Sequence, residues 1–172
     1  MQTKMREEFV KIFGEGREPE FYFAPGRVNL IGEHTDYNGG HVFPCALSIG
    51  TYALARKNDC GKMRFYSLNF TRFGMLAVEG PAQEFTNVLA DNWCNYPKGV
   101  MWAYTQKGYT IDSGLDILYY GNIPNGSGLS SSASIEVATA VILNDQFGFD
   151  VDMVEVSKIC QFSENKFNGV NC

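Results

Sequence analysis

Glycine and serine residues are concentrated between Pro124 and Ser134, in the order Pro-Asn-Gly-Ser-Gly-Leu-Ser-Ser-Ser-Ala-Ser. Gly126 and Gly128 permit tight turns and leave no Cβ atom in the way of a ligand. The serines stand where an apolar helical pattern over 135–147 begins, and serine is a favoured N-cap residue. The first N–H groups of a helix have no intrahelical partner, and the helix dipole adds positive charge there. The stretch therefore predicts an anion site, most often for phosphate, although a flexible connector is the alternative.

Two common phosphate-binding motifs do not fit this stretch. A P-loop requires a lysine after its second glycine, and the next lysine here is Lys158. A dinucleotide fingerprint requires a third glycine, and Ser131 stands at that position. The remaining pattern resembles the phosphate-binding motif of the GHMP small-molecule kinases. The residues that this resemblance assigns to the phosphates of ATP are Pro124, Gly126, Ser127, Gly128, Leu129, Ser130, Ser131 and Ser132.

A second polar cluster follows the apolar run 28–31. Glu33, His34 and Asp36 lie close together in sequence, and such charges beside an apolar strand are costly unless they share a ligand or partners. Carboxylates accept hydrogen bonds from vicinal hydroxyls and imidazole can donate or accept one, so the cluster suits a sugar. A divalent-metal site and a polar hairpin turn with an internal ion pair are the alternatives, and the helical H-E-x-x-H spacing is absent.

The run Gly26-Arg-Val-Asn-Leu-Ile-Gly-Glu-His-Thr-Asp-Tyr37 resembles the galactokinase signature residue for residue. The resemblance implies transfer of the γ-phosphoryl group of ATP to the anomeric hydroxyl of galactose. In that reaction Arg27 would stabilise negative charge, and Glu33, His34 and Asp36 would bind the sugar hydroxyls. A non-catalytic galactose/ATP sensor and a kinase for N-acetylgalactosamine or arabinose remain alternatives. The intact serine loop favours the enzyme.

The same resemblance implies the remaining ATP contacts and a Mg²⁺ ion. Ser67, Trp93 and Tyr96 would border the adenine, although packing as ordinary core side chains is the alternative for each aromatic residue. Ser132 and Glu164 would hold the Mg²⁺ ion, which prefers one or two oxygen ligands from the protein and completes its shell with phosphates and water.

Composition excludes several other classes of protein. The chain has 172 residues, 45% of them hydrophobic, which suits one domain with a substantial core. A net charge of −5 without charge blocks disfavours nucleic acid and anionic membranes as partners. The chain has no long apolar run and no signal-peptide pattern, and its five cysteines include no C-x-x-C pair. We therefore predict reduced thiols and a cytoplasmic location.

The order of patterns predicts an α+β fold, with helices packed on one side of a mixed or antiparallel sheet. The GHMP resemblance implies the same architecture, a domain like domain 2 of ribosomal protein S5. Helices are predicted over 3–13, 92–108, 135–147 and 152–167, and strands over 20–24, 28–31, 42–44, 49–55, 62–67, 74–79 and 115–120.

The resemblance covers only the first half of a normal galactokinase. It assigns residues 1–172 to the N-terminal GHMP domain and places the expected catalytic aspartate at the fourth position after Cys172, outside the sequence. We therefore expect the chain alone to have little or no kinase activity, because it also lacks the C-terminal GHMP domain. A full-length protein is expected to be monomeric, whereas this chain is expected to expose apolar surface and self-associate.

Overall fold

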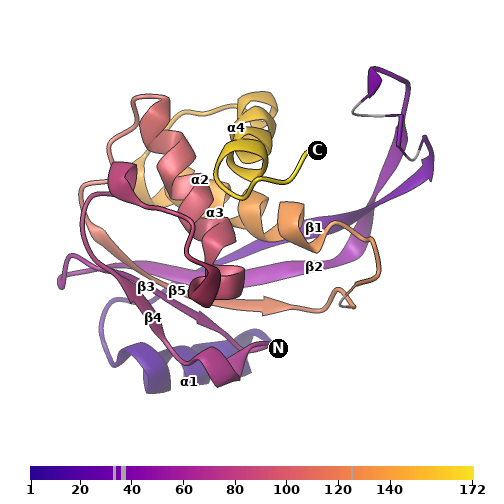
Figure 1. Cartoon of the computed structure of the whole chain (residues 1–172). Helices are drawn as coiled ribbons and strands as arrows, with labels where there is room; N and C mark the ends of the chain where they lie inside the picture. The colour runs from indigo at the N-terminus through magenta and orange to yellow at the C-terminus, as the bar shows by residue number, and fades with distance from the viewer. Residues whose placement is uncertain (33, 36–37, 125) are drawn as a thin grey trace.

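The computed structural model describes residues 1–32, 34–35, 38–124 and 126–172. Five strands form one sheet in the order β1-β2-β5-β3-β4 (Figure 1). The strands are β1 Glu20–Ile31, β2 Phe43–Asn58, β3 Met63–Ser67, β4 Leu76–Val78 and β5 Gly114–Gly121. The helices are α1 Gln2–Phe13, α2 Asn95–Gln106, α3 Ser131–Phe147 and α4 Met153–Lys166, with short 3₁₀ helices η2 Thr71–Phe73, η3 Ala82–Glu84 and η4 Leu89–Cys94.

The sheet is mixed, because β3 pairs with β5 in parallel and all other neighbours are antiparallel. The predicted α+β class is therefore confirmed. The two strands expected on either side of Pro25-Gly26 form one strand, β1, whose pairing with β2 shifts register between Pro25 and Arg27. A proline is tolerated there because β1 lies at the edge of the sheet. The strands predicted over 42–44 and 49–55 likewise join to form β2.

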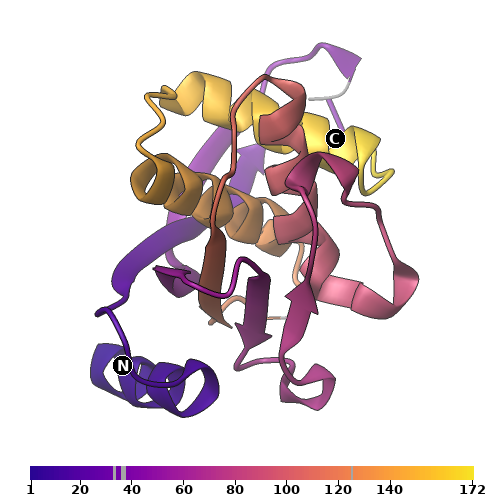
Figure 2. The same ribbon diagram turned by 90° about the vertical axis from the view of Figure 1, so that its left-hand side faces the viewer.

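The two faces of the sheet carry different helices (Figures 1 and 2). Alternation along β2 and β5 sends Ala53 and Ile117 into the larger core beneath α2, α3 and α4. Leu54 and Leu118 point the other way and pack against α1 in a smaller core. Three helices thus share one face, as predicted, but the N-terminal helix covers the opposite face, so the prediction that the helices pack on one side of the sheet is wrong for α1.

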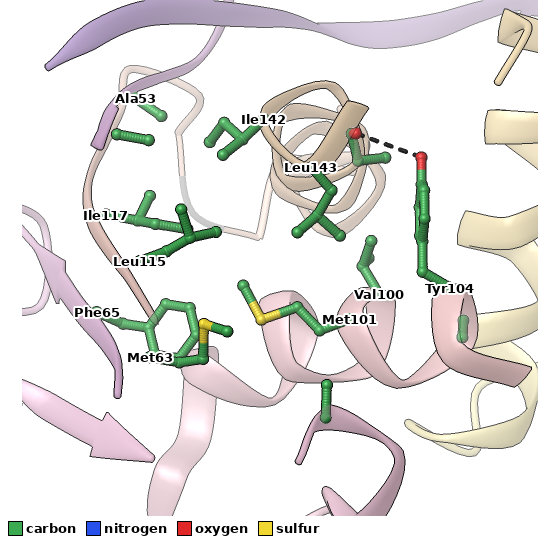
Figure 3. Close-up of a cluster of buried hydrophobic side chains, with 14 of the residues drawn as sticks. Ala53, Met63, Phe65, Val100, Met101, Tyr104, Leu115, Ile117, Ile142 and Leu143 are labelled. Atoms are coloured by element: carbon green, nitrogen blue, oxygen red, sulfur yellow. Dashed lines mark hydrogen bonds between the residues drawn. The ribbon is translucent and has the colours of Figure 1, made fainter. Parts of the chain in front are cut away.

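The larger core joins α2 and α3 to the sheet (Figure 3). Met101 of α2, Leu143 of α3, and Phe65 and Ile117 of the sheet are all fully buried. Tyr104 is also fully buried, and its hydroxyl donates to the side-chain oxygen of Asn144 at 2.9 Å. This core fixes the two helices whose N-terminal ends border the cavity described below.

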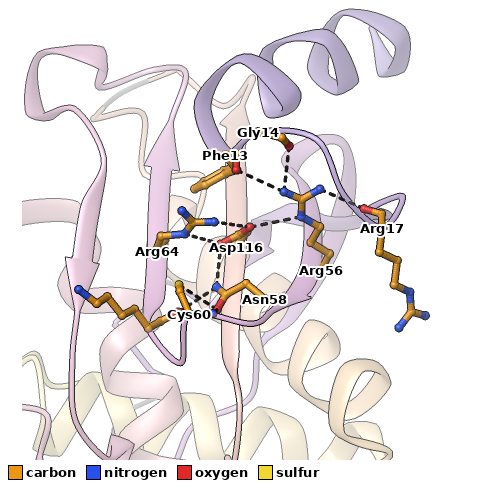
Figure 4. A network of polar contacts seen from close by, with 9 residues as sticks. Phe13, Gly14, Arg17, Arg56, Asn58, Cys60, Arg64 and Asp116 are labelled. Carbon is orange, nitrogen blue, oxygen red and sulfur yellow. Dashed lines mark hydrogen bonds and ion pairs between the residues drawn. The ribbon is translucent and has the colours of Figure 1, made fainter.

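A buried ion cluster fastens α1 to the sheet (Figure 4). The Asp116 carboxylate is fully buried and accepts hydrogen bonds from Arg64 Nε at 2.6 Å and Asn58 Nδ2 at 2.7 Å. Arg56 Nε lies 3.3 Å from the same carboxylate, and its guanidinium also donates to the carbonyl of Gly14 at 3.0 Å. The arginine thereby satisfies a carbonyl at the end of α1, where intrahelical donors run out.

No helix within the described ranges has both the length and the apolar character needed to cross a membrane.

Replacing Asp116 should strongly destabilise the fold. Asp116→Asn leaves Arg56 and Arg64 without their counter-charge at a buried site, and we expect a loss of about 3–5 kcal/mol in the free energy of unfolding. Chemical denaturation followed by circular dichroism measures this loss. Glu79→Gln is the matched control, because Glu79 pairs with Lys62 at the surface, and its unfolding midpoint should stay near that of the wild type. Equal losses in both variants would contradict a stabilising role for the cluster.

Candidate functional site

The glycine-serine loop leads from β5 into α3 through a series of left-handed residues. Gly126, Gly128 and Ser130 have φ values of 69°, 70° and 60°. Backbone that alternates in this way can turn successive N–H groups toward a common point and so form an anion-binding concavity. Among the described residues, Ser127 is the loop residue whose N–H has a backbone acceptor, the carbonyl of Pro124. The loop therefore offers unpaired donors at the start of α3.

The expected serine N-cap is present, but its side chain does not cap the helix. Ser130 precedes α3, but its side chain makes no capping hydrogen bond. An N-cap residue adopts extended backbone angles, whereas Ser130 is left-handed, with φ 60° and ψ 46°. Within the described part of the chain, the hydroxyls of Ser130, Ser131 and Ser132 have no hydrogen-bond partner, so they are available to a ligand.

The loop directly contacts the strand that leads into the second polar cluster. The N–H of Arg27 donates to the carbonyl of Leu129 at 3.2 Å. A Cβ atom on Gly26 would lie only 2.9 Å from the same carbonyl oxygen, so a larger residue would force the segments apart. The buried Ser134 hydroxyl adds a second connection, since it donates to the carbonyl of Ala24 at 2.8 Å and accepts from the N–H of Thr51 at 3.0 Å.

A cavity of about 410 Å³ opens beside the loop, next to the N-terminal end of α2. Its lining includes Ser131 and Ser132 of α3 together with Ser67, Trp93 and Tyr96. The structure thus brings the three predicted adenine contacts to the same cavity as two serines of the predicted phosphate loop. Trp93 is buried, and its indole Nε1 has no hydrogen-bond partner among the described residues. Such an unpaired donor suits a ligand with an acceptor.

Two buried carboxyl groups face each other behind the serines. Glu136 follows Ser132 by one helical turn and therefore lies on the same side of α3. Its Oε1 accepts hydrogen bonds from Ser163 Oγ and Asn168 Nδ2, both at 3.2 Å. Burial raises the pKa of the Glu136 carboxyl, and the adjacent carboxyl of Glu164 raises it further. Glu136 was not predicted as a site residue, although a charged residue inside an apolar helical pattern was a usable signal.

Tyr96 connects the cavity to these carboxyl groups. Burial raises the pKa of its hydroxyl, and the nearby Glu164 and Glu136 act in the same direction. Glu164 itself is 6% exposed and does not line the cavity. The predicted metal ligands Ser132 and Glu164 therefore stand at the cavity wall and just behind it.

Of the predicted catalytic residue Arg27 and the predicted sugar contacts, the structure describes Arg27 in β1 and His34 in the turn that follows β1. Arg27 is an exposed residue of β1 that touches the loop through its backbone. His34 has a left-handed φ of 62°, and its carbonyl accepts from Asn38 Nδ2 at 2.7 Å. Neither side chain lines the cavity. Glu33 and Asp36 lie outside the described residues.

Comparison with known proteins finds two family models and many similar chains. Residues 7–57 match the galactokinase galactose-binding signature, and residues 95–172 match the GHMP kinase N-terminal domain. The galactokinase of Fusobacterium nucleatum is 54% identical over 171 residues, covering 99% of this chain and 43% of that protein. The galactokinase of Bacillus subtilis is 52% identical over 172 residues, covering 100% of this chain and 44% of that protein.

A solved structure agrees with these sequence matches. The crystal structure of Lactococcus lactis galactokinase complexed with galactose superposes with a TM-score of 0.94 and 43% identity, covering 99% of this chain and 44% of that one. The chain spans less than half the length of the curated relatives that it matches. The matches at both motifs and the shared fold show that this chain belongs to the galactokinases of the GHMP kinase superfamily and corresponds to their N-terminal region.

Proposed function

We propose that this chain supplies the sugar-binding and ATP-binding surfaces of a galactokinase, which transfers the γ-phosphoryl group of ATP to the anomeric hydroxyl of galactose. The observation that carries the proposal is the contact between Arg27 and Leu129. It joins Arg27, at the start of the run that resembles the galactokinase signature, to the predicted phosphate loop, and the residues proposed to bind the sugar follow Arg27 in the sequence. Phosphoryl transfer depends mainly on such positioning and on stabilisation of charge.

The cavity residues suit a nucleotide. The loop N–H groups and the hydroxyls of Ser131 and Ser132 would hold the phosphates, and the positive end of the α3 dipole favours the same charge. Trp93 and Tyr96 would flank the base, and a shift of the Trp93 ring would let its buried, unpaired Nε1 donate to a ring nitrogen. Ser67, which is also part of the lining, would contact the base from β3.

The donor set beside the phosphate loop fits a magnesium ion held partly by the nucleotide. Searched over the described ranges, the chain has no group of three His, Cys, Asp or Glu residues able to hold a metal by themselves. Ser132 and Glu164 would supply two oxygen ligands, which matches the preference of Mg²⁺ for few protein ligands. The chemistry that a bound ion supplies is neutralisation of charge on the β- and γ-phosphates.

Arg27, Glu33, His34 and Asp36 would act on the sugar side of the reaction. The Arg27 guanidinium would stabilise charge near the transferred group, and the other three side chains would bind hydroxyls of the hexose. The galactose bound to the Lactococcus lactis relative supports galactose as the sugar. A site built from hydroxyl-binding groups should reject epimers that misplace one hydroxyl.

The proposal is tested by calorimetric titration of the chain with galactose, with glucose as the epimeric control, and with ATP in the presence of Mg²⁺. We expect galactose to bind more tightly than glucose, and ATP to bind more tightly with Mg²⁺ than without it. Failure to bind ATP, or equal affinity for the two sugars, would contradict the proposed function.

Removing the indole donor of Trp93 should weaken nucleotide binding. Trp93→Phe keeps an aromatic ring in the cavity wall but loses Nε1–H, and loss of one hydrogen bond should weaken ATP binding about fivefold. Calorimetry measures the dissociation constant, and thermal melting shows whether the variant is folded. An unchanged dissociation constant in a folded variant would show that Nε1 does not contact the nucleotide.

The buried Glu136 should make the fold less stable as the pH rises. Below the ordinary pKa of 4.5 the carboxyl is protonated in both the folded and the unfolded chain, so it contributes no pH dependence. Above that value the unfolded chain releases the proton, while burial opposes ionisation in the folded chain, so unfolding becomes easier. Glu136→Gln is neutral at every pH and should lose less stability than the wild type between about pH 5 and pH 8, by about 1–3 kcal/mol.

Urea denaturation at a series of pH values in EDTA measures this difference, because EDTA removes divalent cations that would favour the ionised carboxylate. Glu84→Gln, at the surface, is the control and should follow the wild type. Parallel pH profiles for Glu136→Gln and the wild type would show that the carboxyl is not held neutral.

A further inference from the structure

Five asparagine residues line the cavity, and the hydrogen bonds of four of them define two pairs. The five are Asn69, Asn87, Asn92, Asn95 and Asn168. The carbonyl oxygen and amino group of Asn69 bond to the N–H and carbonyl of Gly121, at 2.7 and 2.8 Å. Asn95 does the same to Val88, at 3.0 and 2.7 Å. These two amides are fully engaged in holding the backbone around the cavity.

Asn87 and Asn168 instead bond to each other across the cavity rim. Nδ2 of Asn87 donates to Oδ1 of Asn168 at 3.2 Å, between segments 81 residues apart in sequence. Nδ2 of Asn168 then donates to Oε1 of Glu136 at 3.2 Å. One amide, Asn168, therefore links the loop before α2 to the carboxyl pair behind the serines. We call the contact between Asn87 and Asn168 the amide bridge.

Both ends of the amide bridge are anchored on α2. At the start of α2, the Asn95 side chain forms hydrogen bonds with the backbone of Val88, the neighbour of Asn87. One turn later, α4 approaches so closely that a Cβ atom on Gly99 would lie 2.9 Å from the Phe167 ring. Phe167 also packs against Trp102, with ring centroids 5.7 Å apart. Val88 and Phe167, the neighbours of Asn87 and Asn168, are thus both held against α2. The amide bridge then joins the two segments to each other.

We propose that Asn168 is a positioning residue which, through the amide bridge, sets the separation between the two ends of a bound nucleoside triphosphate. The inference rests on the proposed function, because it concerns the same cavity. The loop that carries Asn87 borders the base end of the cavity, where Trp93 and Tyr96 lie. Glu136 and Glu164 lie toward the phosphate end, beside Ser132. A ligand that contacts both ends benefits when their separation is already fixed.

The proposal predicts which ligands should respond when the bridge is lost. Adenosine contacts only the base end of the cavity. It can therefore bind when the loop that carries Asn87 is displaced, without restoring the distance to the phosphate end. ATP with Mg²⁺ engages both ends at once and must restore their separation on binding. Loss of the bridge should therefore weaken binding of the triphosphate and leave adenosine nearly unchanged, whereas simple unfolding of the loop would weaken both ligands equally.

The test is a double-mutant cycle on the 172-residue chain with Asn87→Ala, Asn168→Ala and the double variant. Binding of ATP with Mg²⁺ is measured by calorimetry, and binding of adenosine by NMR titration. We expect each single variant to bind ATP about fivefold more weakly, and the double variant to be no weaker than the worse single variant, because both changes break one interaction. Asn165→Ala is the control: Asn165 accepts from the N–H of Cys172 and does not line the cavity.

Several results would overturn the inference. Wild-type affinity for ATP in both single variants, additive losses in the double variant, or equal weakening of adenosine and ATP would each exclude the bridge as a positioning device. Asn87→Ala keeps the bond between Asn168 and Glu136 and removes only an exposed side chain, so it provides a folded variant if Asn168→Ala unfolds. If the wild type bound neither ligand, the proposed function itself would fail, which is a different outcome from normal binding in the variants.

Discussion

The contact between the carbonyl of Leu129 and the N–H of Arg27 is the constraint on which the rest of the site depends. It is possible only because Gly26 has no side chain, since a Cβ atom there would collide with the loop. The Ser134 hydroxyl reinforces it from the first turn of α3, by bonding to backbone groups of both β1 and β2. The N-terminal end of α3, where the phosphates are proposed to bind, is thereby fixed to the strands that lead to the residues proposed to bind the sugar.

Hydrogen-bond satisfaction separates the structural polar groups from those available to a ligand. Asp116 is buried among two arginines and an asparagine with its charge fully compensated, and it lies on the α1 side of the sheet. A group with complete partners has nothing left to offer a substrate. The hydroxyls of Ser131 and Ser132 are different, because these residues line a cavity and the hydroxyls lack partners in the described part of the chain. Trp93 Nε1 also lacks a partner there, although it is buried in the cavity wall. Polar groups with complete partners thus stabilise the fold on one face of the sheet, whereas the unpartnered polar groups beside the other face are proposed to bind a ligand.

The sequence predicted long, strongly patterned elements well and contacts between distant elements poorly. The apolar run before the loop became β5 and the apolar run after it became α3, because each is a continuous apolar stretch of suitable length with glycine at its boundaries. The side of the sheet covered by α1 could not be predicted, since that depends on which strand residues face it. Ser130 is the N-cap of α3, as predicted, but it makes no capping hydrogen bond because the loop holds this residue left-handed. Glu136 and Asn168 were missed because their contacts depend on how α3 meets α4, and the roles assigned to all of the predicted site residues remain predictions.

Sugar and triphosphate are proposed to bind next to each other on this one domain. Paramagnetic relaxation tests it directly: Mn²⁺ replaces Mg²⁺ in complex with ATP, and the NMR relaxation of galactose protons is measured in the presence of the chain. The account predicts strong relaxation of the proton on the anomeric carbon, which is lost when excess Mg²⁺ displaces Mn²⁺. If galactose and ATP both bind but no galactose proton responds to Mn²⁺, the two sites are separate and the account is contradicted.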